Sequence, residues 1–501
     1  MPVQLQVDGR DVSVPDDGAS LLEALRDRLG IRSPKDGCSP QGQCGCCTVL
    51  VDGAPRVACV TPVRRVAGRR ITTLDGLPEA DRQAWADAFI ACGASQCGFC
   101  TPGIIMRLAA TAGRAAPEEA LLAHLCRCTG WRTILDAASL PPAPPRDLEA
   151  AGRRATIEGH APQVVGPHVA LGQGGFADDT APLDALVAVA DGRGGWAVGE
   201  TLTEARARAG KVQGRRTTIE PRPPVDLPPG DWDLTLRTSW VEPAYLEPDA
   251  SWCAPGGEPA SPLANGGAFG GKRHSPVPAI ARRLADELGR PVRVLFSRED
   301  VVRLGPKRPP LAAGVRADGT GVVRVVRTPG IADAIRSVAP GFEVDEVDVP
   351  GPPTSADIRA AGWAEAAVLL AALRKEARVV APDGATAEVQ FDGHGRLLVR
   401  VACGEPLDDV VLRSYCVGAA HMALGWVRSE GIAVDADGVA HDLTIRSLGI
   451  LRAKDMPEVE VEIEPAGGPP VNGSDAVFAA VAAAAWLADG LPGQWPTKGA
   501  T

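Results

Sequence analysis

The sequence lacks the features of membrane, secreted and nucleic-acid-binding proteins. No apolar run approaches the ~20 residues of a membrane helix, and the alanine-rich stretch 477–488 is too short. The first residues, Met-Pro-Val-Gln-Leu-Gln, are not a secretion signal. A net charge of −10 gives a nucleic-acid partner no electrostatic support. We therefore expect a cytoplasmic protein that binds neither membrane nor nucleic acid.

The size and composition are those of an ordinary globular protein. A chain of 501 residues, 45% hydrophobic and 23% charged, predicts two to four domains. Thirteen cysteines would indicate disulfide bonds in a short secreted chain, but this chain is long and carries no secretion signal. We therefore looked for metal-binding patterns among the cysteines.

Eight cysteines form two groups of four. The first group has C-x5-C-x2-C spacing followed by a more distant cysteine, and the second consists of two close pairs separated by a helix-length gap. The groups are Cys38, Cys44, Cys47 and Cys59, and Cys97, Cys100, Cys126 and Cys128.

The spacing of the first group indicates which metal the thiolates bind. Thiolate ligands select zinc, copper(I) or iron–sulfur clusters. C-x5-C-x2-C is close to the plant-type ferredoxin pattern, whereas zinc sites usually have paired spacing on both halves. The sequence therefore predicts two [2Fe–2S] clusters. A zinc-bound interaction module and eight buried structural thiols are the alternatives, and Cys46 could compete with Cys47 as a ligand.

Local patterns around the cysteines predict an α+β protein. Residues 3–14 read as a hairpin, and a capping box of Ser20 and Glu23 begins a helix that runs to Gly30. This opening and a glycine-rich cysteine loop suit a β-grasp ferredoxin domain over 1–74. A helical [2Fe–2S]-binding domain follows over 75–140, and its last helix runs from Pro117 to near Cys126. The proline-rich stretch 141–151 is the expected linker.

The two cysteine motifs together resemble the xanthine oxidase (molybdenum hydroxylase) family. The second motif reads Gln-Cys-Gly-Phe-Cys-Thr-Pro-Gly over 96–103 and Cys-Arg-Cys-Thr-Gly over 126–130. That family carries both motifs in this order, each binding a [2Fe–2S] cluster. Five residues, 39–43, stand where the family usually has four. The resemblance also implies that Gln96 touches the pterin of a molybdopterin cofactor.

The second half resembles the molybdenum-binding part of the same family in a shortened form. We expect a hammerhead-like region over 152–220 and a molybdopterin-binding-like domain over 221–501. The stretch 265–272, Asn-Gly-Gly-Ala-Phe-Gly-Gly-Lys, resembles the family loop that lies against the cofactor. That resemblance implies that the cofactor contacts Gly267, Phe269 and Gly270.

The glycine-rich stretch 265–272 has two other interpretations. It nearly matches a phosphate-binding P-loop, but Arg273 replaces the serine or threonine that such a loop requires. A simple glycine-rich turn between a strand and a helix is the other alternative.

The catalytic residues are unknown from the sequence. In the family a glutamate in a Gly-x-Gly-Glu loop is the general base, but here that stretch ends Gly467-Gly468-Pro469. Glu464 is the nearest carboxylate, and His421 is more consistent with a packing residue. We expect the chain alone to turn over slowly or not at all unless Glu464 or a partner's carboxylate completes the site.

The resemblance implies an oxidoreductase component like those of xanthine, aldehyde and CO dehydrogenases. It would pass electrons from molybdopterin, in its plain or cytosine-dinucleotide form, through two [2Fe–2S] clusters. Because the chain has no flavin domain, we expect a separate FAD-binding subunit. A further molybdenum subunit or a second copy of the chain are other expected partners. The alternative is a non-catalytic electron-transfer and scaffold subunit. The small-molecule substrate is unidentified.

Overall fold

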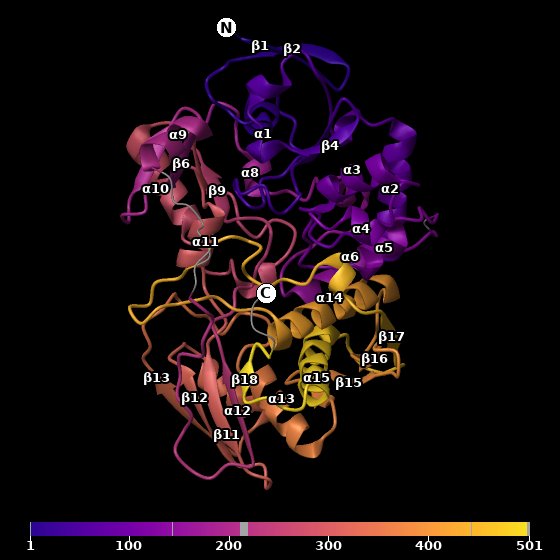
Figure 1. The fold of residues 1–501 in the computed structure, drawn as a ribbon, viewed down its shortest axis with the longest axis vertical. Coiled ribbons are helices and arrows are strands. Elements are labelled where there is room, and N and C mark those ends of the chain that lie inside the picture. The colour runs from indigo at the N-terminus through magenta and orange to yellow at the C-terminus, as the bar shows by residue number, and fades with distance from the viewer. Residues whose placement is uncertain (1, 143, 211–218, 442, 498–501) are drawn as a thin grey trace.

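The computed structural model describes residues 2–142, 144–210, 219–441 and 443–497. Within these ranges the fold is α+β and contains four sheets of four or five strands. Figure 1 shows the N-terminal region at one end of the molecule and two sheet-containing lobes at the other. The predicted fold class is confirmed.

The first sheet belongs to a ferredoxin-like N-terminal region. Its strands have the order β2-β1-β5-β3-β4. They are β1 Val3–Val7, β2 Arg10–Val14, β3 Thr48–Val51, β4 Ala54–Val57 and β5 Arg70–Thr72. Ser20 caps helix α1 (Leu21–Glu23), as predicted, and a π-helical turn continues it. The Glu23 carboxylate does not close a capping box, because it accepts hydrogen bonds from the backbone N–H and the hydroxyl of Thr203.

Helices flank the second cysteine group. They are α2 Glu79–Cys92, α3 Thr101–Thr111, α4 Pro117–Ala120 and α5 Arg132–Ala137. The members of the group lie in the loops between α2 and α3 and between α4 and α5. The helix expected from Pro117 to near Cys126 is wrong in length, because α4 ends at Ala120. Tertiary contacts replace the helix there: Leu125 N–H donates to the Cys44 carbonyl at 3.0 Å. That bond joins the loop before Cys126 to the first cysteine group.

The expected linker 141–151 is partly helical. Helix α6 (Leu148–Gly159) begins inside it, with Asp147 as its N-cap. The side chain of Arg146 pairs with Asp408 and donates to the Ile90 carbonyl. Residues 146–151 are therefore fixed against the rest of the molecule and do not form a linker.

The expected boundary at residue 220 is not a boundary in space. The second sheet has the order β7-β6-β10-β9, with strands from both sides of it. Its strands are β6 Leu186–Ala190, β7 Trp196–Gly199, β9 Ala250–Cys253 and β10 Val292–Leu295. The helices beside these strands are α7 Pro167–Ala170, α8 Ala177–Thr180, α9 Leu202–Ala209, α10 Val277–Leu288 and α11 Arg298–Leu304. The sequence of residues 202–212 predicts a helix that continues to Val212, and residues 211 and 212 lie outside the described residues.

The remaining chain forms two further lobes. One contains the sheet β13-β12-β11-β8-β18 with α12 and α13, and the other contains β14-β15-β16-β17 with α14 and α15. The elements are β8 Leu234–Thr238, β11 Leu311–Val315, β12 Gly321–Val326, α12 Ile331–Val338, β13 Phe342–Val347, α13 Trp363–Arg374, β14 Arg378–Val380, β15 Thr386–Phe391, β16 Leu397–Ala402, α14 Asp409–Arg428, β17 Val459–Ile463, α15 Gly473–Ala488 and β18 Gln494–Trp495.

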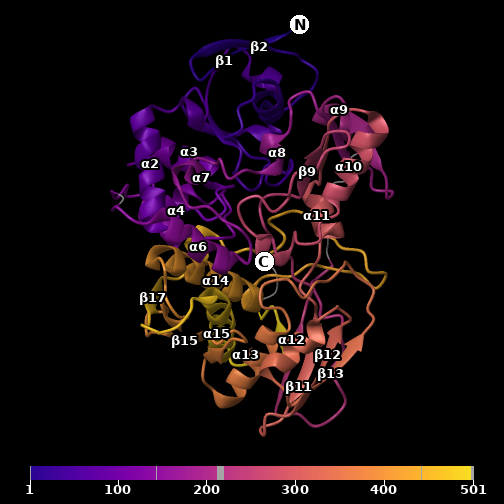
Figure 2. The same ribbon diagram turned by 180° about the vertical axis from the view of Figure 1, so that it is seen from behind.

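Helix α14 joins the second lobe to the iron–sulfur region. It is 20 residues long and apolar enough to span a membrane by length and composition, but 89% of its apolar window is buried inside the protein. Figures 1 and 2 both show it beside α15 and next to α6. His421 on this helix is buried, and its Nε2 lies 3.0 Å from the Leu451 carbonyl. Burial lowers the pKa of His421 to about 3, so the predicted packing role is confirmed.

Candidate functional site

The first cysteine group lies in one buried loop and the turn that follows β4. Cys38, Cys44 and Cys47 come from the loop, and Cys59 comes from the turn. The N–H of Cys59 donates to the Cys47 sulfur at 3.4 Å. Hydrogen bonds from Cys44 and then Cys59 hold the pKa of Cys38 well below its usual value. The same contacts raise the pKa of Cys44 and of Cys59, so the thiols lie close enough to hydrogen-bond one another.

The loop that carries the first cysteine group also contains the one-residue insertion within 39–43 and a further thiol, Cys46. Arg206 donates to the Ser39 hydroxyl at 2.9 Å and pairs with Asp36, which anchors the insertion. Cys46 is also buried among these cysteines. A Cβ added to Gly37 would lie 3.1 Å from the sulfurs of both Cys44 and Cys46. Glycine at 37 therefore lets the backbone pass directly beside the sulfurs.

The second cysteine group forms two facing pairs. The sulfurs of Cys97 and Cys128 are 3.7 Å apart. A hydrogen bond from Cys100 lowers the pKa of Cys126 to about 6, and the Thr129 hydroxyl lies 3.2 Å from the Cys126 sulfur. In the described part of the chain, no three histidine, cysteine or acidic side chains gather as the ligands of a single ion would. Facing pairs are what a two-iron cluster needs, because each iron takes two thiolates.

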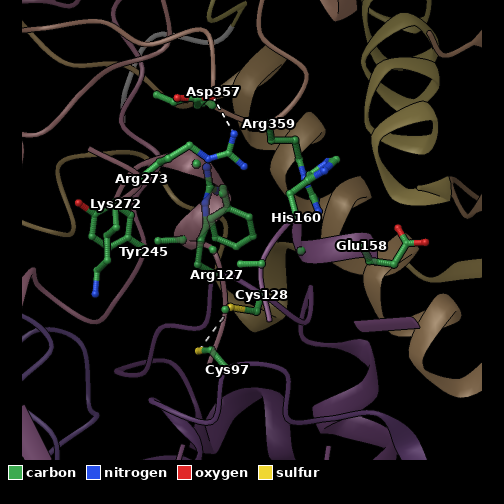
Figure 3. Close-up of a pocket in the computed structure, with 18 of the residues that line it drawn as sticks. Cys97, Arg127, Cys128, Glu158, His160, Tyr245, Lys272, Arg273, Asp357 and Arg359 are labelled. Carbon is green, nitrogen blue, oxygen red and sulfur yellow. Dashed lines mark hydrogen bonds and ion pairs between the residues drawn. The ribbon is translucent and has the colours of Figure 1, made fainter. Parts of the chain in front are cut away.

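A cavity of about 280 Å³ lies directly beside the second group. Figure 3 shows Cys97 and Cys128 next to each other at the end nearest the iron–sulfur region. The other walls come from the end of α6, the glycine-rich stretch 265–272 and the segment 356–361. Seven predicted site residues line the cavity together: Gln96, Cys97, Cys100, Cys128, Gly267, Phe269 and Gly270.

The glycine-rich loop is wedged between two backbone segments. A Cβ on Gly267 would lie 2.5 Å from the Gly159 carbonyl oxygen, and one on Gly270 would lie 1.9 Å from the Asp357 carbonyl oxygen. Phe269 has a positive φ of 55°. The loop can line the cavity in this conformation only because side chains are absent at these two positions.

The structure does not support the P-loop interpretation. The Lys272 ammonium pairs with Glu247 at 2.7 Å and lies near the Pro248 and Pro262 carbonyls. It is 1% exposed. A P-loop lysine instead reaches the phosphates of its ligand.

Gln96 acts mainly as a clamp in this structure. Its side-chain Nε2 donates to the Cys128 carbonyl and to the Ser414 hydroxyl, both at 3.0 Å. Its backbone carbonyl accepts from Asn265 Nδ2 at 3.1 Å. Gln96 therefore joins the second cysteine group to α14 and to the glycine-rich loop at the cavity wall.

Sequence reasoning missed a charged cluster on the opposite wall. Arg359 Nε lies 3.0 Å from Asp475 Oδ1, and His160 Nε2 lies 2.9 Å from Asp475 Oδ2. The Arg359 guanidinium lies over the Phe269 ring at 5.4 Å. These residues belong to no local motif, since they come from three distant segments. The position of Asp475 in the first turn of α15 was the one available signal.

Glu464, the nearest carboxylate to the expected position of the general base, does not line the cavity. Its backbone N–H donates to the Val401 carbonyl just after β17, and its side chain is exposed. The pairing of β17 with β16 fixes Glu464 in the lobe that contains the sheet β14-β15-β16-β17. Asp475, Asp357 and Glu158 are instead carboxylates that line the cavity.

Two family models match the N-terminal region. One, described as a 2Fe-2S iron-sulfur cluster binding domain, matches residues 4–64, and the other, a [2Fe-2S] binding domain, matches residues 73–139. A nicotinate dehydrogenase subunit of Pseudomonas putida is 43% identical over 146 residues, which are 27% of this chain and 90% of that protein. The xanthine dehydrogenase iron-sulfur-binding subunit of Escherichia coli O157:H7 is 40% identical over 147 residues, 27% of this chain and 85% of that protein. The chain belongs to the xanthine oxidase family.

The relatives match similar shares of this chain but very different shares of their own length. The alignment with xanthine dehydrogenase of Blastobotrys adeninivorans, at 38% identity over 148 residues, spans 26% of this chain and only 10% of that protein. The crystal structure of the aldehyde oxidoreductase of Desulfovibrio desulfuricans has a TM-score of 0.67 at 13% identity. The structural match covers 96% of this chain and 97% of the aldehyde oxidoreductase chain. The whole chain thus has the aldehyde oxidoreductase fold.

The cavity residues fit the molybdopterin cofactor that the fold implies. A flat, polar cofactor needs close backbone approach and hydrogen-bonding groups along its edge. Gly267 and Gly270 allow the close backbone approach. The polar side chains of Gln163, Asn265 and Tyr415 line the wall, where they bond one another and the backbone in this structure. When bound, the cofactor would supply the two-electron chemistry, and these residues would hold and orient it.

Replacing Gly270 with alanine should distort the glycine-rich loop. The new Cβ would meet the Asp357 carbonyl at 1.9 Å, and φ is +85°. We expect a loss of about 2–4 kcal/mol in the free energy of unfolding, from the clash and backbone strain combined. Gly395→Ala is the control, because φ is +82° there but nothing lies within 4 Å. Equal losses in denaturant unfolding for both variants would contradict the close approach at Gly270.

Proposed function

We propose that the chain is the electron-transferring, cofactor-binding component of a molybdenum hydroxylase. Molybdopterin occupies the 280 Å³ cavity, and the eight predicted cysteines bind two [2Fe–2S] clusters. The observation that carries the proposal is the shared wall: Cys97 and Cys128 line the same cavity as the glycine-rich loop. Electrons released in the cavity can therefore enter a cluster without crossing another part of the protein.

Contact between the two cysteine groups supports a continuous electron path. The Leu125 N–H, next to Cys126, donates to the Cys44 carbonyl at 3.0 Å. A Cβ on Gly103 would lie 2.2 Å from the Gly45 carbonyl. The two groups thus sit against each other through their own loops. In the proposed path electrons pass from the second cluster to the ferredoxin-type cluster.

A separate FAD subunit is the proposed acceptor. Two relatives are named as subunits of dehydrogenases, which supports a partner for this chain. Val60, next to Cys59, is 50% exposed and places apolar surface beside the ferredoxin-type group. We propose that the FAD subunit docks there and that the substrate is a small aldehyde or N-heterocycle.

The Gln96 clamp gives a direct test of the proposed cofactor site. Gln96→Ala leaves the Cys128 carbonyl and Ser414 hydroxyl without their shared donor, at a cost of about 1–3 kcal/mol. We expect both clusters to remain and molybdenum retention to fall, as measured by metal analysis of the purified chain. Gln390→Ala is the control, because Gln390 is exposed and bonds only Glu388. Unchanged molybdenum content in Gln96→Ala would count against the proposed cofactor site. If the wild-type chain holds both clusters but no molybdenum, the chain is instead an electron-transfer subunit.

A further inference from the structure

The cavity contains a histidine held by a buried carboxylate. His160 follows α6 and lines the cavity, and its side chain is 53% exposed. Its Nε2 lies 2.9 Å from Oδ2 of Asp475, which is 8% exposed in the first turn of α15. The pair therefore combines an accessible imidazole with a fixed carboxylate, in the chain that lacks the family's glutamate at 467–469.

Hydrogen bonding around the pair determines which ring nitrogen carries the proton. Asn472 Nδ2 lies 3.0 Å from His160 Nε2, but it also bonds the Ile157 and Glu158 carbonyls at 3.0 and 3.1 Å. Those two carbonyls use both of its N–H groups. His160 Nε2 therefore donates to Asp475, and Nδ1 is the acceptor nitrogen of the neutral ring. None of the hydrogen bonds between described residues uses Nδ1.

We propose that His160 Nδ1 is the proton acceptor of the hydroxylation reaction and that Asp475 positions it. The proposal rests on the function proposed above. The attacking oxygen breaks its O–H bond, gives the proton to Nδ1 and keeps the electron pair for its bond to the substrate carbon. The substrate C–H bond breaks as the C–O bond forms. Its two electrons leave through the clusters to the acceptor, and its hydrogen is released as a second proton. The Asp475 carboxylate stabilises the imidazolium that forms.

The charges around His160 agree with this assignment. Asp475 and Arg359 face it from neighbouring elements. Glu158 on its own helix also adds negative charge, but its carboxylate bonds Arg154. The hydrogen bond to Asp475 raises the pKa of His160, although burial and Arg359 oppose the shift. Burial opposes ionisation of Asp475, but His160 and then Arg359 outweigh it and lower the pKa of that carboxyl. These charges therefore favour a protonated His160 imidazole next to an ionised Asp475 carboxylate.

The pH dependence of turnover tests the role of His160. The base acts when neutral, so turnover should rise as the pH passes upward through the raised pKa of His160. His160→Gln should lower turnover by on the order of 10²–10⁴-fold and remove this rise. Asp475→Asn should move the rise to lower pH, because the imidazolium loses its partner. His441→Gln is the control, since His441 pairs with Asp435 at 2.8 Å outside the cavity and should leave turnover unchanged.

Three measurements on the wild-type chain and each variant separate the outcomes. They are molybdenum content with cluster spectra, turnover of benzaldehyde and hypoxanthine with an artificial acceptor, and nuclear magnetic resonance titration of labelled histidines. The proposal expects unchanged metals in His160→Gln and a rise in wild-type turnover at the pKa measured for His160. Turnover of His160→Gln within a few-fold of wild type would overturn it, as would no turnover by a fully loaded wild-type chain. A wild-type chain without molybdenum would overturn the proposed function and this inference together.

Discussion

Replacing Arg127 with methionine should lower the free energy of unfolding by about 3–5 kcal/mol. Arg127 lies between two predicted cluster ligands and makes a two-pronged ion pair with Glu430, at 2.5 and 2.7 Å. The two side chains are only 3% and 2% exposed. The variant leaves the Glu430 charge buried without a partner, and burial already raises the pKa of that carboxyl.

The Arg127–Glu430 pair connects the iron–sulfur region to the end of α14. Its loss should therefore also weaken the contact between these two parts of the protein. A double variant, Arg127→Met with Glu430→Leu, should recover much of the stability, because removing both partners leaves no uncompensated charge. Arg324→Met is the matched control: Arg324 pairs with Asp345 on the surface and should change stability by less than about 1 kcal/mol. Denaturant unfolding of the four proteins measures this. A loss at Arg127 no larger than that at Arg324 would contradict the buried pairing.

Replacing Cys47 with serine should abolish the ferredoxin-type centre and leave the other intact. The Cys47 sulfur accepts the Cys59 N–H at 3.4 Å, which places it inside the first group. Electron paramagnetic resonance of the reduced wild-type chain should show two distinct [2Fe–2S] signals, and Cys47→Ser should show one.

Two further cysteine variants give this experiment its controls. Cys253→Ser should keep both signals, because Cys253 lies outside both groups and its sulfur bonds the Ala254 and Gly257 carbonyls, which a serine hydroxyl can also do. Cys46→Ser should also keep both if Cys47 is the ligand. Loss of the ferredoxin-type signal in Cys46→Ser, with retention in Cys47→Ser, would assign the ligand to Cys46 instead.

The sequence was most informative where the chemistry is local. Each group contains at least two cysteines that are close in sequence, so the spacing of the cysteines alone predicted both groups. The Ser20 cap and the glycine-rich loop were also visible, because a cap and a tight backbone approach each impose residue types on a few adjacent positions.

The sequence was least informative where distant segments meet. The sheet β7-β6-β10-β9 combines strands from before and after residue 220. No local sequence pattern predicts that β6 pairs with β10. Helix α4 ends early because the loop after it bonds to the Cys44 carbonyl. Glu464 was considered because of its position in the chain, but β17 fixes it in the lobe that contains the sheet β14-β15-β16-β17. His160 and Asp475, by contrast, meet only in the folded protein.

Molybdenum, iron and sulfide content of the wild-type chain, purified in one preparation, tests the central claim most directly. The claim is that this single chain holds two clusters and, beside Cys97 and Cys128, a molybdopterin. We expect iron and sulfide sufficient for two [2Fe–2S] clusters and one molybdenum per chain. Full iron and sulfide without molybdenum would contradict the cavity assignment, and stoichiometric zinc without sulfide would contradict the clusters as well.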